Sequence, residues 1–143
     1  MSKIAKNLEV ILANSYSLYL KTQNFHWNVT GPNFKSLHEL FALHYEEIIP
    51  AIDILAERIR TLGLKVDGSY ENFAKLTKFQ SANKDLSAKE MVFELVNSNK
   101  ILIELLKEAI EIAQNEKDEA SADILIGRVE AHQKNVWMLE SSL

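Results

Sequence analysis

Four residues of this chain, His26, His38, Asp53 and Glu57, carry side chains that bind transition metals. Imidazole nitrogen and carboxylate oxygen together suit iron or zinc, and redox chemistry would also need open coordination positions. The chain contains no cysteine, so any metal site in it must use histidine and carboxylate ligands. The spacing of these four residues decides how they can meet.

The two histidines lie on opposite sides of Gly31-Pro32-Asn33, a sequence that predicts a tight break between two helices. In an antiparallel helical hairpin, residues at similar distances from the turn lie side by side. His26 and His38 can therefore meet across the first two helices. Asp53 and Glu57 are four residues apart and share a face of the second helix.

The histidines and the carboxylates are too far apart to meet in one chain. Asp53 follows His38 by fifteen residues on one predicted helix, which separates them by roughly 22 Å along the axis. We predict a two-fold interface at which one chain supplies the histidines and its partner the carboxylates, giving two sites per dimer. Because Asp-x-x-x-Glu is also a common surface pattern, a plain helical interaction domain stays an alternative.

A conventional di-iron site inside one four-helix bundle would use Glu-x-x-His motifs, and this chain has none. The residues three positions before its four histidines are Gln23, Lys35, Phe41 and Val129. The intrachain di-iron site is therefore excluded, and the site shared between chains remains. His44 falls at the edge of an apolar stripe and His132 on one, so we expect both to be packed or hydrogen-bonded rather than ligands.

The elements that must position these residues are helices. Apolar residues recur at helical spacing in four long segments, which are residues 2–29, 33–62, 87–115 and about 119–139. Ser87 and Glu90 match the capping box at the start of the third segment. A short helix is predicted over residues 70–76, with Ser69 as its cap.

The segment between the second and third long helices, residues 63–86, is too long for a simple turn back. Twenty-four residues can travel the length of a bundle, which makes those two helices parallel. We therefore predict an all-α, ferritin-like four-helix bundle with a long crossover that contains a short helix. Without an internal repeat or linker, residues 1–143 are expected to form one domain.

The composition is ordinary for a globular chain, with 47% apolar and 25% charged residues. The net charge of −4 does not suggest a protein that coats nucleic acid. Lys6, Asn7 and Glu9 interrupt any apolar stretch at the start, so no signal peptide is predicted. No apolar run is long enough to span a membrane, and we expect the protein in the cytoplasm.

A longer pattern resembles a known family. The sequence Asn24-Phe25-His26-Trp27-Asn28-Val29-Thr30-Gly31, then His38, then Asp53-Ile54-Leu55-Ala56-Glu57-Arg58-Ile59, is similar to that of the miniferritins, the DNA-protecting proteins of starved cells (Dps). The spacing His-x11-His-x14-Asp-x3-Glu is highly specific. The likeness covers nearly the whole chain, including the closing Val136-Trp137-Met138-Leu139.

The resemblance implies a hollow dodecamer of four-helix subunits with ferroxidase sites at the dimer interfaces. Fe(II) would be bound there and oxidised, preferably by hydrogen peroxide and otherwise by oxygen, and ferric mineral would collect in the cavity. By position, His26 and His38 are ligands from one subunit and Asp53 and Glu57 from its two-fold mate. Trp27 would lie close to the site, although an interface aromatic is an equally compatible interpretation.

The family also uses acidic pores on three-fold axes, built near the start of the last helix. The matching residues here are Asp118, Glu119 and Asp123, with Asp123 the best placed. An acidic first turn is equally the ordinary complement to a helix dipole, so this alternative stays open.

One position departs from the family pattern. The family usually has Asp or Glu one helical turn after the second histidine, where this chain has Ala42. Four ligands remain, so we expect one well-held metal and a weaker second position. Oxidation could be slowed, or the site could prefer zinc. The alternative function is therefore a non-catalytic metal-binding or nucleoid-associated cage with an impaired centre.

Binding of DNA, for which the family is named, is not expected. In the family it often depends on a flexible Lys/Arg-rich tail. Here the first helix can start almost at Ser2, only Lys3 and Lys6 are basic nearby, and the sequence closes at Leu143 without a basic tail. Duplex binding requires several phosphates to be neutralised, which a net-negative chain opposes.

Overall fold

The computed structural model describes residues 2–143 and contains five helices, with no strand in that range. The helices are α1 (Lys3–Asn28), α2 (Phe34–Thr61), α3 (Tyr70–Leu76), α4 (Ala88–Asn115) and α5 (Glu119–Glu140). The four long helices were predicted to within a few residues, and the short one at its observed bounds. None of the helices in residues 2–143 combines the length and apolar character needed to cross a bilayer.

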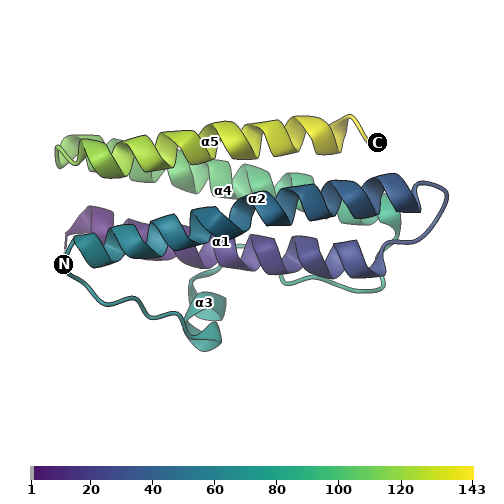
Figure 1. Cartoon of the computed structure of the whole chain (residues 1–143), viewed down its shortest axis with the longest axis horizontal. Coiled ribbons are helices and arrows are strands. Elements are labelled where there is room, and N and C mark those ends of the chain that lie inside the picture. Colours follow the sequence, from purple (N-terminus) through teal and green to yellow (C-terminus); the bar gives the residue numbers. More distant parts are fainter. Residues whose placement is uncertain (1) are drawn as a thin grey trace.

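The long helices form two antiparallel hairpins that pack on each other. α1 and α2 make one hairpin, α4 and α5 the other, and α3 contacts α1 from outside the bundle (Figure 1). The segment after α2 returns along the bundle before α4 begins, so α2 and α4 run in the same direction (Figure 1). The predicted four-helix bundle with a long crossover is confirmed.

Local sequence signals set where these helices begin and end. Four side chains each cap a helix by accepting the backbone N–H three residues ahead: Ser2, Ser69, Ser87 and Asp118. At α4 the cap is reciprocal, because Glu90 Oε1 also accepts the backbone N–H of Ser87 at 3.1 Å. Gly31 and Gly63, at the C-terminal ends of α1 and α2, adopt φ of +112° and +90°, where glycine carries no steric penalty.

Apolar side chains from all four long helices form the core. Its fully buried members include Leu18, Phe25, Phe41, Leu55, Leu95, Leu106 and Leu125. Helical spacing along α2 places Phe41, Ile48, Ile52, Leu55 and Ile59 on one stripe. Four of them are no more than 1% exposed, and Ile52 is partly buried at the edge of the core. This burial fixes the rotation of α2 about its axis and therefore the direction in which its polar flank points.

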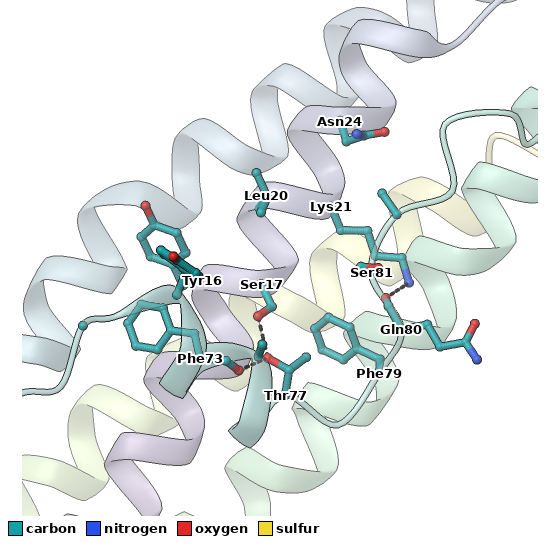
Figure 2. Close-up of a pocket in the computed structure, with 14 residues that line it drawn as sticks. Tyr16, Ser17, Leu20, Lys21, Asn24, Phe73, Thr77, Phe79, Gln80 and Ser81 are labelled. Atoms are coloured by element: carbon teal, nitrogen blue, oxygen red, sulfur yellow. Dashed lines mark hydrogen bonds between the residues drawn. The ribbon is translucent and has the colours of Figure 1, made fainter.

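Polar side chains of α1 hold the crossover against the bundle. Lys21 is only 2% exposed, and its ammonium donates to Gln80 O at 2.9 Å, to Ser98 Oγ at 3.0 Å and to Glu94 Oε2 at 2.7 Å. Asn14 donates to Leu76 O at 3.2 Å and accepts from the backbone of Lys78 at 2.8 Å. Figure 2 shows two of these attachments side by side, Ser17 with Thr77 and Lys21 with Gln80.

Candidate metal centre

His26 and His38 meet across the first hairpin, as their distances from the turn predict. His26 lies in the last turn of α1 and His38 in the first turns of α2. Their rings stack with centroids 3.8 Å apart and planes inclined by 13°. Both residues are half-buried.

Reciprocal hydrogen bonds fix the protonation pattern of the pair. His26 Nδ1 lies 2.7 Å from the backbone oxygen of His38, and His38 Nδ1 lies 2.7 Å from that of His26. A carbonyl oxygen can only accept, so each Nδ1 must carry the hydrogen. In the neutral ring Nε2 then keeps its lone pair, which is the form that binds a metal. The hairpin thus orients two imidazole Nε2 atoms that are chemically able to bind a metal.

The backbone oxygen of His26 is available as an acceptor for a simple reason. His26 is the third residue from the end of α1, so its carbonyl has no N–H of the same helix to accept. His38 Nδ1 occupies that free acceptor. The arrangement therefore ties the end of one helix to the start of the next as well as orienting two rings.

Aromatic rings pack around the histidine pair. Phe34 stacks on His38 at 5.0 Å between centroids, and Tyr45 meets His26 edge-on at 5.3 Å. Trp27 follows His26 directly and is 61% exposed, so within its own chain it has little to pack against. The prediction that Trp27 lies close to a complete site remains a prediction.

Asp53 and Glu57 are exposed on the second half of α2, well away from the histidines of the same chain. Neither carboxylate makes a hydrogen bond or ion pair within residues 2–143. Nowhere in that range do three His, Asp or Glu side chains come together as a metal site. The structure therefore holds the predicted ligands as two separate half-sites, one of nitrogen and one of oxygen.

Ala42 lies one helical turn beyond His38 and is half-buried. Its methyl group offers no donor atom, so the nitrogen half-site contains the two imidazoles alone.

The three acidic residues predicted to line a pore differ in their surroundings. Asp118 caps α5 and pairs with Arg58 at 2.8 Å, so it joins the ends of α2 and α5. Burial alone would raise the pKa of Asp118, but hydrogen bonds from Ser121 and the charge of Arg58 bring it below its ordinary value. Glu119 and Asp123 are exposed. Of the three carboxylates, Asp118 alone makes hydrogen bonds and an ion pair within residues 2–143.

The other two histidines are buried in the core, as predicted. His132 Nδ1 bonds to Asn99 Oδ1 at 2.9 Å, and its Nε2 accepts from Arg128 Nη2 at 3.2 Å. Arg128 in turn makes two hydrogen bonds to the carboxylate of Glu47. Both nitrogens of His132 are therefore engaged within the protein. His44 is 3% exposed, and its Nε2 has no partner in residues 2–143.

The aromatic residues around the histidine pair, Phe34, Tyr45 and Tyr19, were not among the predicted site residues. Tyr45 touches His26, and Tyr19 touches Tyr45 with 5.8 Å between ring centroids. Spacing could have revealed both, because Tyr19 lies seven residues before His26 and Tyr45 seven after His38. Seven residues are about two helical turns, so each tyrosine shares a face with its histidine.

The chain is similar to several known proteins. The ferritin-like domain family matches residues 5–143. A DNA protection during starvation protein of Brevibacillus brevis is 41% identical over 132 residues, covering 92% of this chain and 89% of the relative. Dps from Staphylococcus aureus superposes with a TM-score of 0.94 at 38% identity, covering 98% of this chain and 94% of that one.

A more distant solved structure, the Dps protein of Vibrio cholerae, is described as a member of a broad superfamily of ferritin-like diiron-carboxylate proteins. It superposes with a TM-score of 0.93 at 29% identity, covering 97% of this chain and 87% of that one. These matches confirm the resemblance carried by the pattern from Asn24 to Ile59. They extend over nearly the whole chain, which therefore belongs to the Dps family of ferritin-like proteins.

Proposed function

We propose that this chain is an iron-storage miniferritin that binds Fe(II) at sites shared between two-fold related copies and oxidises it. Hydrogen peroxide is the preferred oxidant, and the ferric product is stored as mineral inside a dodecameric shell. The observation that carries the proposal is the pair of stacked imidazoles locked with both Nε2 atoms free. Family membership adds iron as the metal.

The chemistry follows from the two kinds of half-site. The imidazoles of His26 and His38 bind Fe(II) through neutral nitrogen, while Asp53 and Glu57 of the second copy add two negative charges. Carboxylate oxygen is a hard ligand that favours Fe(III) over Fe(II), so these charges assist oxidation. Four protein ligands leave coordination positions for the oxidant. Zinc would be held by the same ligands without undergoing oxidation.

Mixing two defective variants tests whether the site is shared. His38→Ala removes a nitrogen ligand and Asp53→Ala an oxygen ligand, so each variant alone should lose rapid Fe(II) oxidation. In a mixed dimer, the intact histidines of the Asp53→Ala chain face the intact carboxylates of the His38→Ala chain. One of the two sites of that dimer is therefore complete. Random mixing after dissociation and reassembly should therefore recover about a quarter of the wild-type sites.

Absorbance of Fe(III) after addition of Fe(II) and peroxide measures that recovery. Mixing either variant with itself is the matched control. An intrachain site predicts no recovery in the mixture, and that result would exclude the shared centre.

The alternative is a non-catalytic cage, and the feature that favours it is Ala42. We expect Ala42→Asp to add a ligand one turn from His38, to tighten the second iron and to raise the oxidation rate. Iron titration followed by calorimetry and stopped-flow absorbance compare the two proteins. Identical stoichiometry and rate would mean that Ala42 does not limit the centre. A wild-type protein that binds Fe(II) but oxidises it no faster than Asp53→Ala would support the non-catalytic cage.

A further inference from the structure

A continuous series of aromatic rings runs from the histidine pair to the outer face of α1. Successive centroids are 3.8 to 5.8 Å apart in the order Phe34, His38, His26, Tyr45, Tyr19, Tyr16 and Phe73. Three of the four tyrosines of the chain belong to this series. The fourth, Tyr70, is 82% exposed and makes no ring contact within residues 2–143.

The tyrosine part of the series has one half-buried end and one exposed end. Tyr45 and Tyr19 are half-buried between α1 and α2, and Tyr45 touches the candidate iron ligand His26. Tyr16 is 40% exposed and lies against Phe73 beside the crossover, where it lines a cavity of about 750 Å³ (Figure 2). The series therefore connects the metal half-site with the protein surface.

The chemistry of the proposed site requires an electron donor that such a series could supply. Reduction of hydrogen peroxide to water requires two electrons, which two Fe(II) ions at one centre would supply together. Because this chain has Ala42 in place of an acidic ligand, the proposed centre would hold one iron firmly, and one Fe(II) supplies one electron. One-electron reduction of peroxide yields hydroxide and a hydroxyl radical, which damages the protein.

We infer that Tyr45, backed by Tyr19 and Tyr16, donates the second electron when peroxide is reduced at this centre. This rests on the proposed function. Fe(II), hydrogen peroxide, one tyrosine and one proton give Fe(III), a neutral tyrosyl radical and two water molecules. Iron and the phenol each lose one electron, and the O–O bond of peroxide takes both. The phenolic proton and the proton from solvent complete the two waters.

The contacts explain why Tyr45 acts first. Electron transfer weakens steeply with distance, and Tyr45 is the tyrosine in contact with a ligand of the iron. Tyr19 and then Tyr16 follow at ring separations of 5.8 and 5.6 Å, so the oxidised state can move outward to the exposed ring. Phe73 is much harder to oxidise than tyrosine, so the relay ends at Tyr16. An external reductant can restore the tyrosine there.

A purely structural role makes a different prediction. If the rings only fill space between α1 and α2, then Tyr45→Phe keeps the ring and should leave the iron reaction unchanged. The inference instead requires the phenol oxygen. Tyr45→Phe is therefore the informative variant, and Tyr70→Phe is the matched control outside the series.

The experiment is electron paramagnetic resonance of the assembled protein, frozen within seconds of adding Fe(II) and hydrogen peroxide. Protein labelled with ring-deuterated tyrosine identifies the radical, since deuteration narrows a tyrosyl signal. A spin trap for hydroxyl radical is measured in parallel, and absorbance follows Fe(III). Wild type and Tyr70→Phe should give the same tyrosyl signal. Tyr45→Phe should lose it and release more trapped hydroxyl radical while still oxidising iron.

Two further variants make the outcome unambiguous. Asp53→Ala should abolish the radical together with rapid iron oxidation, because the radical depends on the site. Ala42→Asp should weaken the radical while iron oxidation stays fast, because a second iron then supplies the electron. Rapid iron oxidation with no tyrosyl signal in wild type, or with an equal signal in Tyr45→Phe, would overturn the relay alone. Oxidation no faster than in Asp53→Ala would overturn the proposed function itself.

Discussion

At the scale of single residues, the four histidines show how surroundings decide what an imidazole can do. The rings of His26 and His38 give their Nδ1 hydrogens to backbone oxygens and keep Nε2 open. The ring of His132 has both nitrogens bonded inside the core. The ring of His44 is buried, with its Nε2 unpartnered within residues 2–143. Identical side chains therefore differ in which nitrogen is engaged and in whether the ring is accessible.

The buried histidines make stability depend on pH. Burial, opposed by Glu47 and assisted by Lys134, lowers the pKa of His44 to about 4. Burial, with the positive charge of Arg128 and the nearby His44, lowers the pKa of His132 to about 3. In the folded protein the pKa values of both residues lie below the ordinary value of 6.5, so both side chains are neutral at pH 7.

We predict that the free energy of unfolding falls as the pH drops below about 6.5. In that range the unfolded chain binds protons at both positions and the folded chain does not, so acid favours unfolding. Each histidine contributes a slope of about 1.4 kcal/mol per pH unit until its folded pKa is reached. Above pH 6.5 the two positions contribute no slope.

Urea unfolding between pH 6.5 and 5 measures this slope, because most carboxylates stay ionised in that window. His132→Gln cannot titrate, so its slope should be smaller than that of the wild type by the contribution of one histidine. The substitution also breaks the hydrogen bonds of His132, which lowers the free energy of unfolding by a pH-independent amount. Comparing slopes removes that constant difference. Equal slopes in the two proteins would show that His132 does not titrate as its burial requires.

At the scale of elements, the crossover depends on a few long-range polar contacts. α3 has only seven residues and cannot be stable alone, so its position depends on what binds it to α1. Lys21 supplies three hydrogen bonds and an additional contact with the Phe79 ring at 5.4 Å. A buried ammonium is tolerated because all three of its hydrogens are used.

We predict that Lys21→Met lowers the free energy of unfolding by about 3 kcal/mol, since it removes charge-assisted hydrogen bonds and leaves Ser98 buried without its donor. Loosening should concentrate in the crossover, so amide exchange at residues 77–82 should accelerate more than in the long helices. Calorimetry and hydrogen exchange measure the two effects.

Lys78→Met is the matched control, because Lys78 is an exposed lysine of the same segment that contributes its backbone N–H rather than its side chain. It should change stability by less than about 0.5 kcal/mol. Unchanged exchange at residues 77–82 in Lys21→Met would mean that other contacts, such as those of Asn14, hold the crossover.

At the scale of the whole molecule, charge bears on the activity for which the relatives are named. Each chain has a net charge of −4, and this charge is multiplied in any assembly of identical copies. We predict no retention of duplex DNA in a gel shift at about 0.15 M salt, where screening leaves few favourable contacts with phosphate. A variant extended at its N-terminus by several lysines serves as the positive control. Retention of DNA by the wild type at that salt concentration would contradict the prediction.

The sequence alone determined the features that depend on neighbours along the chain. The helix bounds, the Ser69 cap and the capping box at Ser87 follow from periodicity and local hydrogen bonding. The parallel arrangement of α2 and α4 follows from the length of the segment between them. The meeting of His26 and His38 follows from equal distances to a turn, which a hairpin converts into proximity.

Only the tertiary structure decided how side chains from distant segments are paired. Four features depend on helix rotation and on the path of the crossover. They are the direction of the imidazole hydrogens, the burial of Lys21, the pairing of Asp118 with Arg58 and the series of tyrosine rings. Those are fixed by packing of the whole core, which decides the residue of a distant segment that each side chain meets. Periodicity within one segment identifies its buried face, but it does not identify the residues that lie opposite that face.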